Sequence, residues 1–365
     1  MQNAGWQALY AVVSTRFPVS VQVTAGAGVI CSGLLLRGRV AKGYLGLESN
    51  VLRLGLVSFF TDLSTEMIYP LLPLFLSVTL GVDKAFIGVI EGIAESSASI
   101  SKVFSGWLSD RVKRRRPLIG LGYLVSTIAK PLFAICHTGG HVLTVRLAER
   151  LGKGIRTAPR DALIADSVEK RHMGRSFGVH RAMDTAGAVL GPLIAFILLP
   201  VLKGDYRSIF WLSVIPASAA VLIVFFCVRE RSKPSPGEGV SHLKKHLGRD
   251  FRMFVVVASI FSIGNSSDAF LILRASSLGV PGPMISLLWM SFNVIYALTA
   301  VPGGILSDRF GRRRTISVAF LFYSLIYLGF AHAFSAVHAW VLIGLYGMYY
   351  GLSEGVMRAY VADLV

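Results

Sequence analysis

The sequence predicts an all-helical membrane protein made of two similar halves, and three observations support this fold class. The 365 residues are 53% hydrophobic and only 16% charged, whereas soluble domains carry about 25% charged residues. Apolar runs follow one another along the chain, and about 20 helical residues are enough to cross the hydrocarbon layer. A short charged motif also occurs twice, 198 residues apart.

Ten apolar segments are expected to span the membrane, six in the first half of the chain and four in the second. Their approximate ranges are 50–80, 85–108, 117–137, 141–164, 174–201, 207–228, 251–274, 283–306, 315–334 and 338–362. Residues 49–228 would form a six-helix bundle and residues 251–365 an incomplete bundle of four helices. A Pro-containing, basic cytoplasmic linker at 229–250 would join them, and residues 1–48 are expected to be an extension outside the core fold.

The distribution of basic residues predicts how the chain is oriented. A net charge of +17 would suggest nucleic acid as the partner of a soluble protein. Here Lys and Arg gather in alternate short loops, such as 111–116 and 309–314, while the loops between hold few of them. Positive loops mark the cytoplasmic side. We therefore expect a multi-pass protein of the bacterial plasma (inner) membrane, surrounded by lipid, and no nucleic acid partner.

Neither a cofactor nor a metal site is expected. Three cysteines lie far apart inside apolar runs, and histidines four residues apart lack a neighbouring carboxylate or thiol. The sequence contains no G-x-x-x-x-G-K-[ST] phosphate loop, which argues against direct use of ATP. No nucleophile–base arrangement stands out, so we do not expect an enzyme.

The repeated motif reads GWLSDRVKRRR from Gly106 and GILSDRFGRRR from Gly304. In both copies an apolar run ends, a small charged turn follows, and a new apolar run begins. Asp166 and Asp363 lie at nearly the same distance beyond the two copies, at the ends of corresponding spans. A copy in register at this distance indicates a duplicated fold.

The motif resembles the signature loop of the major facilitator superfamily of transporters, G-x-x-x-D-R-x-G-R-R. The second copy has the expected Gly311, whereas the first copy has Lys113 in its place. The resemblance covers roughly residues 49–365 and implies two helical bundles that rock about a central site. A complete member of the superfamily has twelve spans, so the last two helices are expected to be absent from this sequence.

The resemblance also implies that the motif loops latch the two halves together on the cytoplasmic side. Gly106 and Gly304 would let neighbouring helices approach closely, and acidic and basic side chains would form one charge cluster in each half. The members are Asp110, Arg111, Arg160 and Asp166 in the first half, and Asp308, Arg309, Arg358 and Asp363 in the second. The alternative, that the basic residues only orient the helices, does not explain Gly and Asp at fixed spacing.

Carboxylates inside the first span are candidates for proton transfer. Asp62 and Glu66 are four residues apart and share one helical face. A carboxylate within a membrane is costly unless it faces a partner or a cavity, and a desolvated carboxyl can exchange protons near neutral pH. The alternative is a pair of salt-bridged structural residues.

Polar residues of other spans complete the expected pathway. Arg150 lies in RLGKG, which resembles the fourth-span motif R-x-x-Q-G that proton-coupled exporters of the superfamily link to proton transfer. Asp184 lies in the fifth span, and Asn265 and Asp268 in the seventh, the counterpart of the first. Glu354, in the tenth span, is expected to face the fourth span across the cavity.

A small-residue motif in the fifth span favours export. Gly187, Gly191 and Pro192 resemble the G-x-x-x-G-P motif of the antiporter branch, although small residues four apart are also a general device for helix packing. With the fourth-span motif, they predict a monomeric transporter that exports a small organic solute in exchange for protons. Asp62 or Glu66 would carry the proton, with Arg150 as its electrostatic modulator. Uptake by symport or facilitated diffusion, or a non-transporting scaffold or sensor, are the alternatives.

Overall fold

The computed structural model describes residues 48–111, 114–169, 172–230 and 248–364. Most of the predicted extension and linker therefore lie outside the described residues. Within the described residues the regular structure is helical and contains no strands, which confirms the predicted all-helical fold class.

Helices occupy each of the six segments predicted for the first half. The first segment contains a long helix, a short turn of helix and a π-helical turn, and the sixth is divided in two. The elements are α3 (Ser49–Ile68), α4 (Leu72–Leu74), η2 (Phe75–Thr79), α5 (Lys84–Arg111), α6 (Arg116–Leu132), η3 (Phe133–Ile135), α7 (Gly139–Ser167), α8 (Met173–Val201), α9 (Tyr206–Leu212) and α10 (Val214–Phe226).

Helices also occupy the four segments predicted for the second half. They are α11 (Arg249–Gly264), α12 (Asp268–Ser277), α13 (Gly282–Phe310), α14 (Arg312–His332) and α15 (Ala336–Leu364). Among the described residues, six helical stretches are long and apolar enough to cross a membrane: α6, α8, α9–α10, α11–α12, α13 and α14. The other long helices, α3, α5, α7 and α15, contain most of the charged residues that the sequence singles out.

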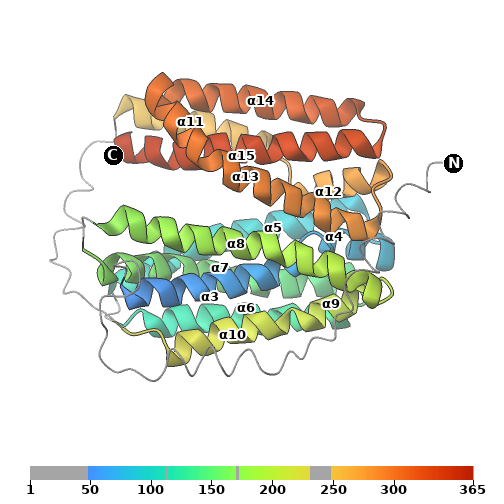
Figure 1. The fold of residues 1–365 in the computed structure, drawn as a ribbon, viewed down its shortest axis with the longest axis horizontal. Helices are drawn as coiled ribbons and strands as arrows, with labels where there is room; N and C mark the ends of the chain where they lie inside the picture. The colour runs from blue at the N-terminus through green and yellow to red at the C-terminus, as the bar shows by residue number, and fades with distance from the viewer. Residues whose placement is uncertain (1–47, 112–113, 170–171, 231–247, 365) are drawn as a thin grey trace. The chain divides into compact units, whose positions relative to one another are not determined.

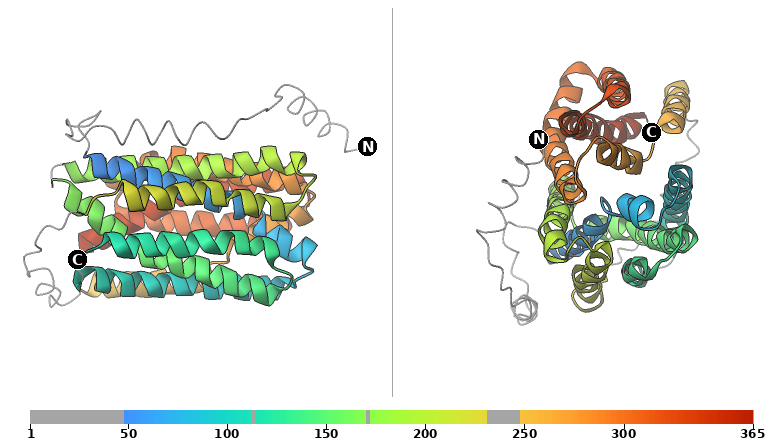
Figure 2. Two further views of the ribbon diagram at one scale, coloured as in Figure 1. Left: turned by 90° about the horizontal axis from the view of Figure 1, so that it is seen from below. Right: turned by 90° about the vertical axis from the view of Figure 1, so that its right-hand side faces the viewer.

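The helices of each half lie next to one another and form two bundles (Figure 1). In the first bundle α3 packs against α8 and α10, while α7 packs against α5 and α6. In the second bundle α15 packs against α13 and α14. The bundles meet mainly where α8 contacts α13 and where α12 contacts α4 and α5, and Figure 2 shows the two groups from the side and from one end.

The halves pack most closely at the end opposite the two repeated motifs, which we call the motif-distal end. There Ala269 and Leu273 of α12 share a buried apolar cluster with Leu71 and Phe75 of the first half. Helix α11 contains no buried residue. The described conformation is therefore closed at the motif-distal end.

Asp205 begins α9 in the loop that follows α8. Its carboxylate accepts hydrogen bonds from the backbone N–H of Arg207 at 3.0 Å and of Ser208 at 3.2 Å. The Ser208 hydroxyl donates to it at 2.6 Å, and this bond is the main reason that the pKa of Asp205 lies below its usual value of 3.8. An N-terminal cap of this kind satisfies backbone donors that the helix leaves unpaired.

Replacing Asp205 by alanine is expected to destabilise the protein by about 1 kcal/mol, because the cap is lost. The free energy of unfolding in detergent micelles is the measurement. Since folding lowers the pKa, the contribution of the charged carboxylate is present above the unfolded-state pKa of about 3.9 and disappears as the pH falls through the folded-state pKa. Asp205→Asn is the matched control: it should keep the cap and lose this pH dependence. Equal stability of all three proteins would contradict the capping role.

Candidate functional site

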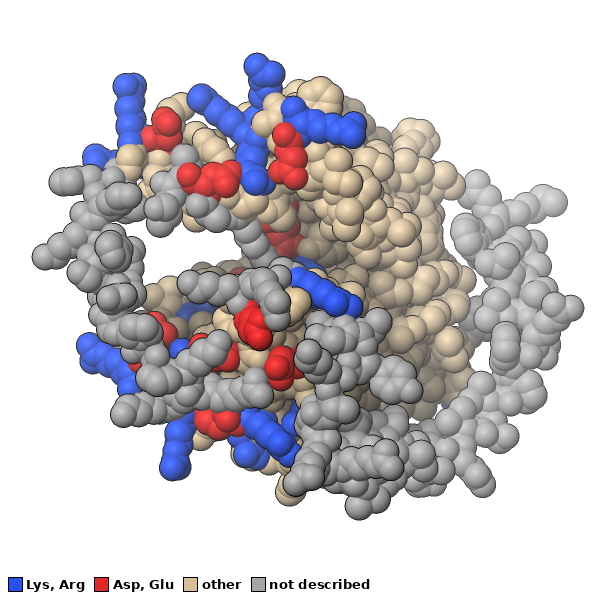
Figure 3. Space-filling model, turned by 60° about the vertical axis from the view of Figure 1, so that its left-hand side comes forward, with Lys and Arg blue, Asp and Glu red and all other residues tan. Residues whose placement is uncertain are grey.

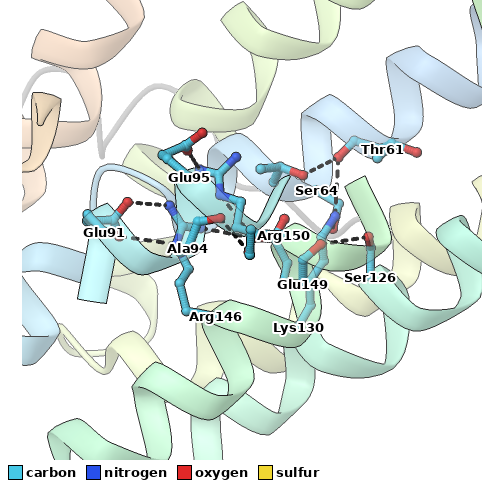
Figure 4. A network of polar contacts seen from close by, with 12 residues as sticks. Thr61, Ser64, Glu91, Ala94, Glu95, Ser126, Lys130, Arg146, Glu149 and Arg150 are labelled. Atoms are coloured by element: carbon cyan, nitrogen blue, oxygen red, sulfur yellow. Dashed lines mark hydrogen bonds and ion pairs between the residues drawn. The ribbon is translucent and has the colours of Figure 1, made fainter. Parts of the chain in front are cut away.

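A buried ion-pair network joins α5 and α7 in the first bundle, and Figure 4 shows it at close range. Arg146 forms a bidentate ion pair with Glu91. Its Nε donates a hydrogen bond to Oε1 at 3.1 Å, and its Nη2 donates one to Oε2 at 2.9 Å. Its Nη1 donates to Glu149 Oε2 at 3.0 Å. The three side chains are 2–5% exposed. Because every nitrogen of this guanidinium has an acceptor, Arg146 acts as a structural brace.

Arg150, one helical turn further along α7, is bound less completely. Its Nη2 lies 3.0 Å from Oε1 of Glu95, and the Arg150 side chain is 4% exposed while that of Glu95 is 57% exposed. Its Nε lies 3.5 Å from Glu149 Oε2 and has no hydrogen-bond partner within the described residues. Arg150 is therefore a buried cation with an exposed counterion.

Lys130 connects α6 to α3, the helix that carries the candidate carboxylates Asp62 and Glu66. Its Nζ donates to Ser64 Oγ at 2.8 Å and to the Thr61 carbonyl at 3.3 Å (Figure 4). The side chain is almost fully buried. A buried ammonium held by neutral oxygens is stable only where carboxylates lie nearby, and Asp62, Glu66 and Glu149 all act on it electrostatically.

Asp62 lies against Asp184, which α8 brings to α3. The two carboxyl groups lie close enough to act on each other, and two carboxyls can form a hydrogen bond only if they share a proton. The helices approach closely because Gly187 and Gly191 face α3: a Cβ atom on Gly191 would lie 2.6 Å from the Leu63 carbonyl oxygen. The fifth-span glycines thus bring this pair of carboxyls together, and Pro192 follows within the same helix.

Glu66 and Asp268 make contacts between the halves. The indole Nε1 of Trp289 on α13 donates to Glu66 Oε2 at 2.8 Å. Asp268, the first residue of α12, accepts from Tyr69 of the first half at 3.4 Å and from Tyr346 of α15 at 2.7 Å. These carboxylates hold the motif-distal contacts between the bundles in place.

A further set of contacts joins α8 to α13 and α15. Arg181 forms an ion pair with Asp184 at 3.1 Å and lies 3.4 Å from Glu354 Oε2. Arg181 also donates to Tyr296, whose hydroxyl donates to Glu354. Glu354 therefore contacts the fifth span, and the expectation that it faces the fourth stays a prediction. The contacts run in one line from Asp62 through Asp184 and Arg181 to the second half.

Asn265 lies apart from these contacts. It is exposed between α11 and α12 and accepts a hydrogen bond from the Tyr323 hydroxyl of α14 at 2.9 Å, within its own half.

Sequence reasoning missed the aromatic partners Trp289, Tyr296 and Tyr346. Aromatic residues are common in membrane helices, and the pattern gave no signal to separate these three from the rest. Among the described residues no group of His, Cys, Asp and Glu could hold a metal ion.

The motif glycines differ from expectation. A Cβ atom on Gly106 would meet the Ala158 methyl at an ordinary 3.5 Å, and one on Gly304 would meet nothing within 4 Å. The prediction that Gly304 permits a close approach is therefore wrong. Its neighbour Gly303 does so instead, since a Cβ there would lie 2.6 Å from the carbonyl oxygen of Gly351 on α15.

The two charge clusters repeat the same ion pair in each half. Asp166 pairs with Arg115 at 2.6 Å, and Asp363 pairs with Arg312. In both cases the partners are 51 residues apart, so the duplication extends to side-chain contacts. Asp308 joins the second cluster, 3.5 Å from Arg312. Arg115 takes the place next to Asp166 that was expected for Arg160, and Arg312 lies next to Asp363.

The other cationic residues of the first cluster have local partners. The Arg111 guanidinium lies 3.9 Å from the centre of the Trp107 ring. Arg160 donates to the Ser58 hydroxyl and to Asp161, each at 3.0 Å. Both residues therefore stay within the first half.

The motif ends of the bundles carry separate groups of charged side chains (Figure 3). Asp110 and Arg309 are exposed, and the Arg358 side chain lies outside the described residues. The ion pairs that the structure describes for the motif residues each stay within one half. The latch between the halves stays a prediction.

Known proteins are similar to this chain in sequence. The model of the Major Facilitator Superfamily matches residues 54–365. An uncharacterized MFS-type transporter of Methanocaldococcus jannaschii is 34% identical over 87% of this chain and 81% of its own length. A multi-drug resistance efflux pump of Streptococcus pneumoniae is 26% identical over 82% of this chain and 76% of its own.

A solved structure gives the same fold at lower identity. A bacterial homolog of the human lysosomal transporter Spinster, in an inward-facing and occupied conformation, superimposes with a TM-score of 0.62 at 17% identity. The match covers 86% of this chain and 77% of that one. With a family model that matches most of its length, this chain is an integral, multi-pass membrane transporter of the major facilitator superfamily.

Proposed function

We propose that this transporter exports a small organic solute in exchange for protons, as a monomer in the bacterial plasma membrane with its motif end in the cytoplasm. The basic loops at the motif end support this orientation. The similarity to an efflux pump and the fifth-span glycines support the direction. Alternating access would move the solute, with the bundles rocking about the contacts between them.

The observation that carries the proposal is the line of contacts from the Asp62–Asp184 pair to the second half. Arg181 lies between Asp184 of its own helix and Glu354 of the other bundle. Protonation of Asp184 would remove its charge and weaken its ion pair with Arg181. Arg181 would then favour Glu354, so proton loading changes the free energy of a contact between the halves. This is the differential interaction that coupling requires.

Glu66 supplies a second link between a carboxyl and the conformation. Trp289 of the second half donates a hydrogen bond to Glu66, and this bond would be lost if the bundles separated at the motif-distal end. Opening of that end would expose Glu66 to water and to protons from that side. Protonation of Glu66 would in turn remove the charge that the indole N–H stabilises, so proton access and opening are linked.

The test uses the full chain in proteoliposomes with two fluorescent probes of similar size, the anion 2-naphthalenesulfonate and the cation N-methylquinolinium. An opposing proton gradient should drive at least one probe against its own gradient. Asp62→Asn and Glu66→Gln should abolish this effect, because a proton carrier is lost. In both variants, the exchange of probe across the membrane should persist when no proton gradient is applied. Asp250→Asn, at an exposed carboxylate on α11, is the matched control and should behave as the wild type.

Each other result would contradict the proposal. Movement of the probe in the same direction as the protons would indicate symport. Wild-type flux that ignores the gradient, or gradient-driven flux that survives in both variants, would exclude these carboxyls as proton carriers. Failure of the wild type to move either probe would count against the export of organic ions.

A further inference from the structure

Arg150 and Arg146 are consecutive arginines on one face of α7, yet their environments differ. Arg146 uses its three nitrogens in hydrogen bonds to buried carboxylates. Arg150 makes one close contact, to Glu95, and its buried Nε has no hydrogen-bond partner among the described residues. A buried donor without an acceptor is costly. The cost is understandable if an acceptor arrives during the transport cycle.

Glu95, the counterion of Arg150, can move away while its own carboxylate stays solvated. Glu95 is more than half exposed, so its carboxylate retains access to water when it moves away. Lys153, one turn along α7, is also exposed and attracts Glu95 electrostatically. Figure 4 shows Glu95 reaching across to the Arg150 guanidinium from α5. Glu95 thus occupies the position that an external anion would take on Arg150.

Aromatic rings lie beside this cation, and those of Trp289 and Phe292 are buried in the described conformation. The Arg150 guanidinium is 5.9 Å from the centre of the Tyr69 ring. The Tyr69 ring is 5.2 Å from that of Trp289, which is stacked on Phe292 at 4.5 Å. These rings belong to both bundles and meet at the contact between them. Flat apolar groups bind well to such rings.

We propose that Arg150 binds the solute directly and that the solute is an organic anion, a carboxylate or sulfonate on a flat apolar body. The anionic group replaces Glu95 on the guanidinium, and Glu95 moves to Lys153. One carboxylate replaces another, so the buried positive charge stays compensated throughout. The planar fork of arginine suits two oxygens of such a group. This inference rests on the transport function proposed above.

Equilibrium binding of 2-naphthalenesulfonate and N-methylquinolinium to the detergent-purified full chain tests the inference, together with the KM of each probe in proteoliposomes. Glu95→Gln should tighten binding of the anion about threefold, because its internal competitor is gone. Arg150→Lys should weaken binding of the anion at least about tenfold, because the fork is lost. Binding of the cation should not follow this pattern, and Asp250→Asn should change neither probe.

The outcomes separate this inference from the proposed function. Proton-driven transport of the cation without binding of the anion would keep the function and overturn the inference. Binding of the anion that responds to both variants, without proton-driven flux, would keep the site and overturn the function. If Arg150→Lys does not fold, Glu95→Gln decides: unchanged or weaker binding of the anion overturns the inference, since a purely structural Arg150–Glu95 pair predicts no gain.

Discussion

Replacement of Arg146 by methionine is expected to destabilise the protein by about 3–5 kcal/mol, the largest effect of any single substitution considered for this fold. The change removes the cation that pairs with Glu91 and one of the two cations beside Glu149, and both side chains are no more than 5% exposed. Buried charges without a counterion have no water to solvate them. The free energy of unfolding in mixed micelles is the measurement.

Two controls separate the loss of the ion pair from the loss of an arginine side chain. Arg313→Met removes an exposed arginine from α14 and should change stability by less than about 0.5 kcal/mol. Combining Arg146→Met with Glu91→Gln should recover part of the stability, because Glu91 is then no longer a buried charge without a counterion and Glu149 still faces Arg150. A loss below about 1 kcal/mol for Arg146→Met would show that the network is not the brace described above.

Replacement of Gly191 by alanine is expected to destabilise the protein by about 1–3 kcal/mol through overpacking. The added Cβ would lie 2.6 Å from the Leu63 carbonyl oxygen and 2.8 Å from the Glu66 Cβ. Since the nearest obstacle is backbone, α3 and α8 must move apart. The movement would also shift Glu66, so proton-driven flux should fall together with stability.

The matched control for this glycine lies on the same helix. A Cβ atom on Gly178 would meet nothing within 4 Å. Gly178→Ala should therefore be neutral or stabilise by up to about 1 kcal/mol, because alanine restricts the unfolded chain and favours helix. Equal effects of the two substitutions on the free energy of unfolding would exclude close packing of α3 and α8 as the role of Gly191.

Sequence reasoning predicted those parts of the fold that depend on local composition. Apolar runs placed the ten helical segments, because a membrane helix must be apolar over its own length. The motif pair placed the duplication, since a copied segment keeps its spacing. Asp62, Glu66 and Asp184 stood out because a charge in an apolar run is costly and therefore visible in the sequence.

The tertiary structure decided which of these residues are in contact and how many hydrogen-bond or ion-pair partners each charged side chain has. Arg146 and Arg150 look alike in the sequence. Only the packing of α5 against α7 gives Arg146 an acceptor for each nitrogen and leaves Arg150 with one close partner, the exposed Glu95, and a contact of 3.5 Å to Glu149. The close approach belongs to Gly303 and not to Gly304, which depends on how α13 is rotated about its axis against α15.

The contacts between the halves show most clearly the difference between what the sequence predicts and what the tertiary structure decides. Glu66 was visible as a carboxylate in an apolar span, but its partner Trp289 lies 223 residues away. An aromatic residue costs nothing in a membrane helix, so neither its own position nor its neighbours mark it as functional. The sequence by itself determined the helices, the duplication and the charged candidates, because each has a local free-energy cost or a repeat. Only the folded chain determined their partners, because long-range contacts arise from helix packing that no local pattern encodes.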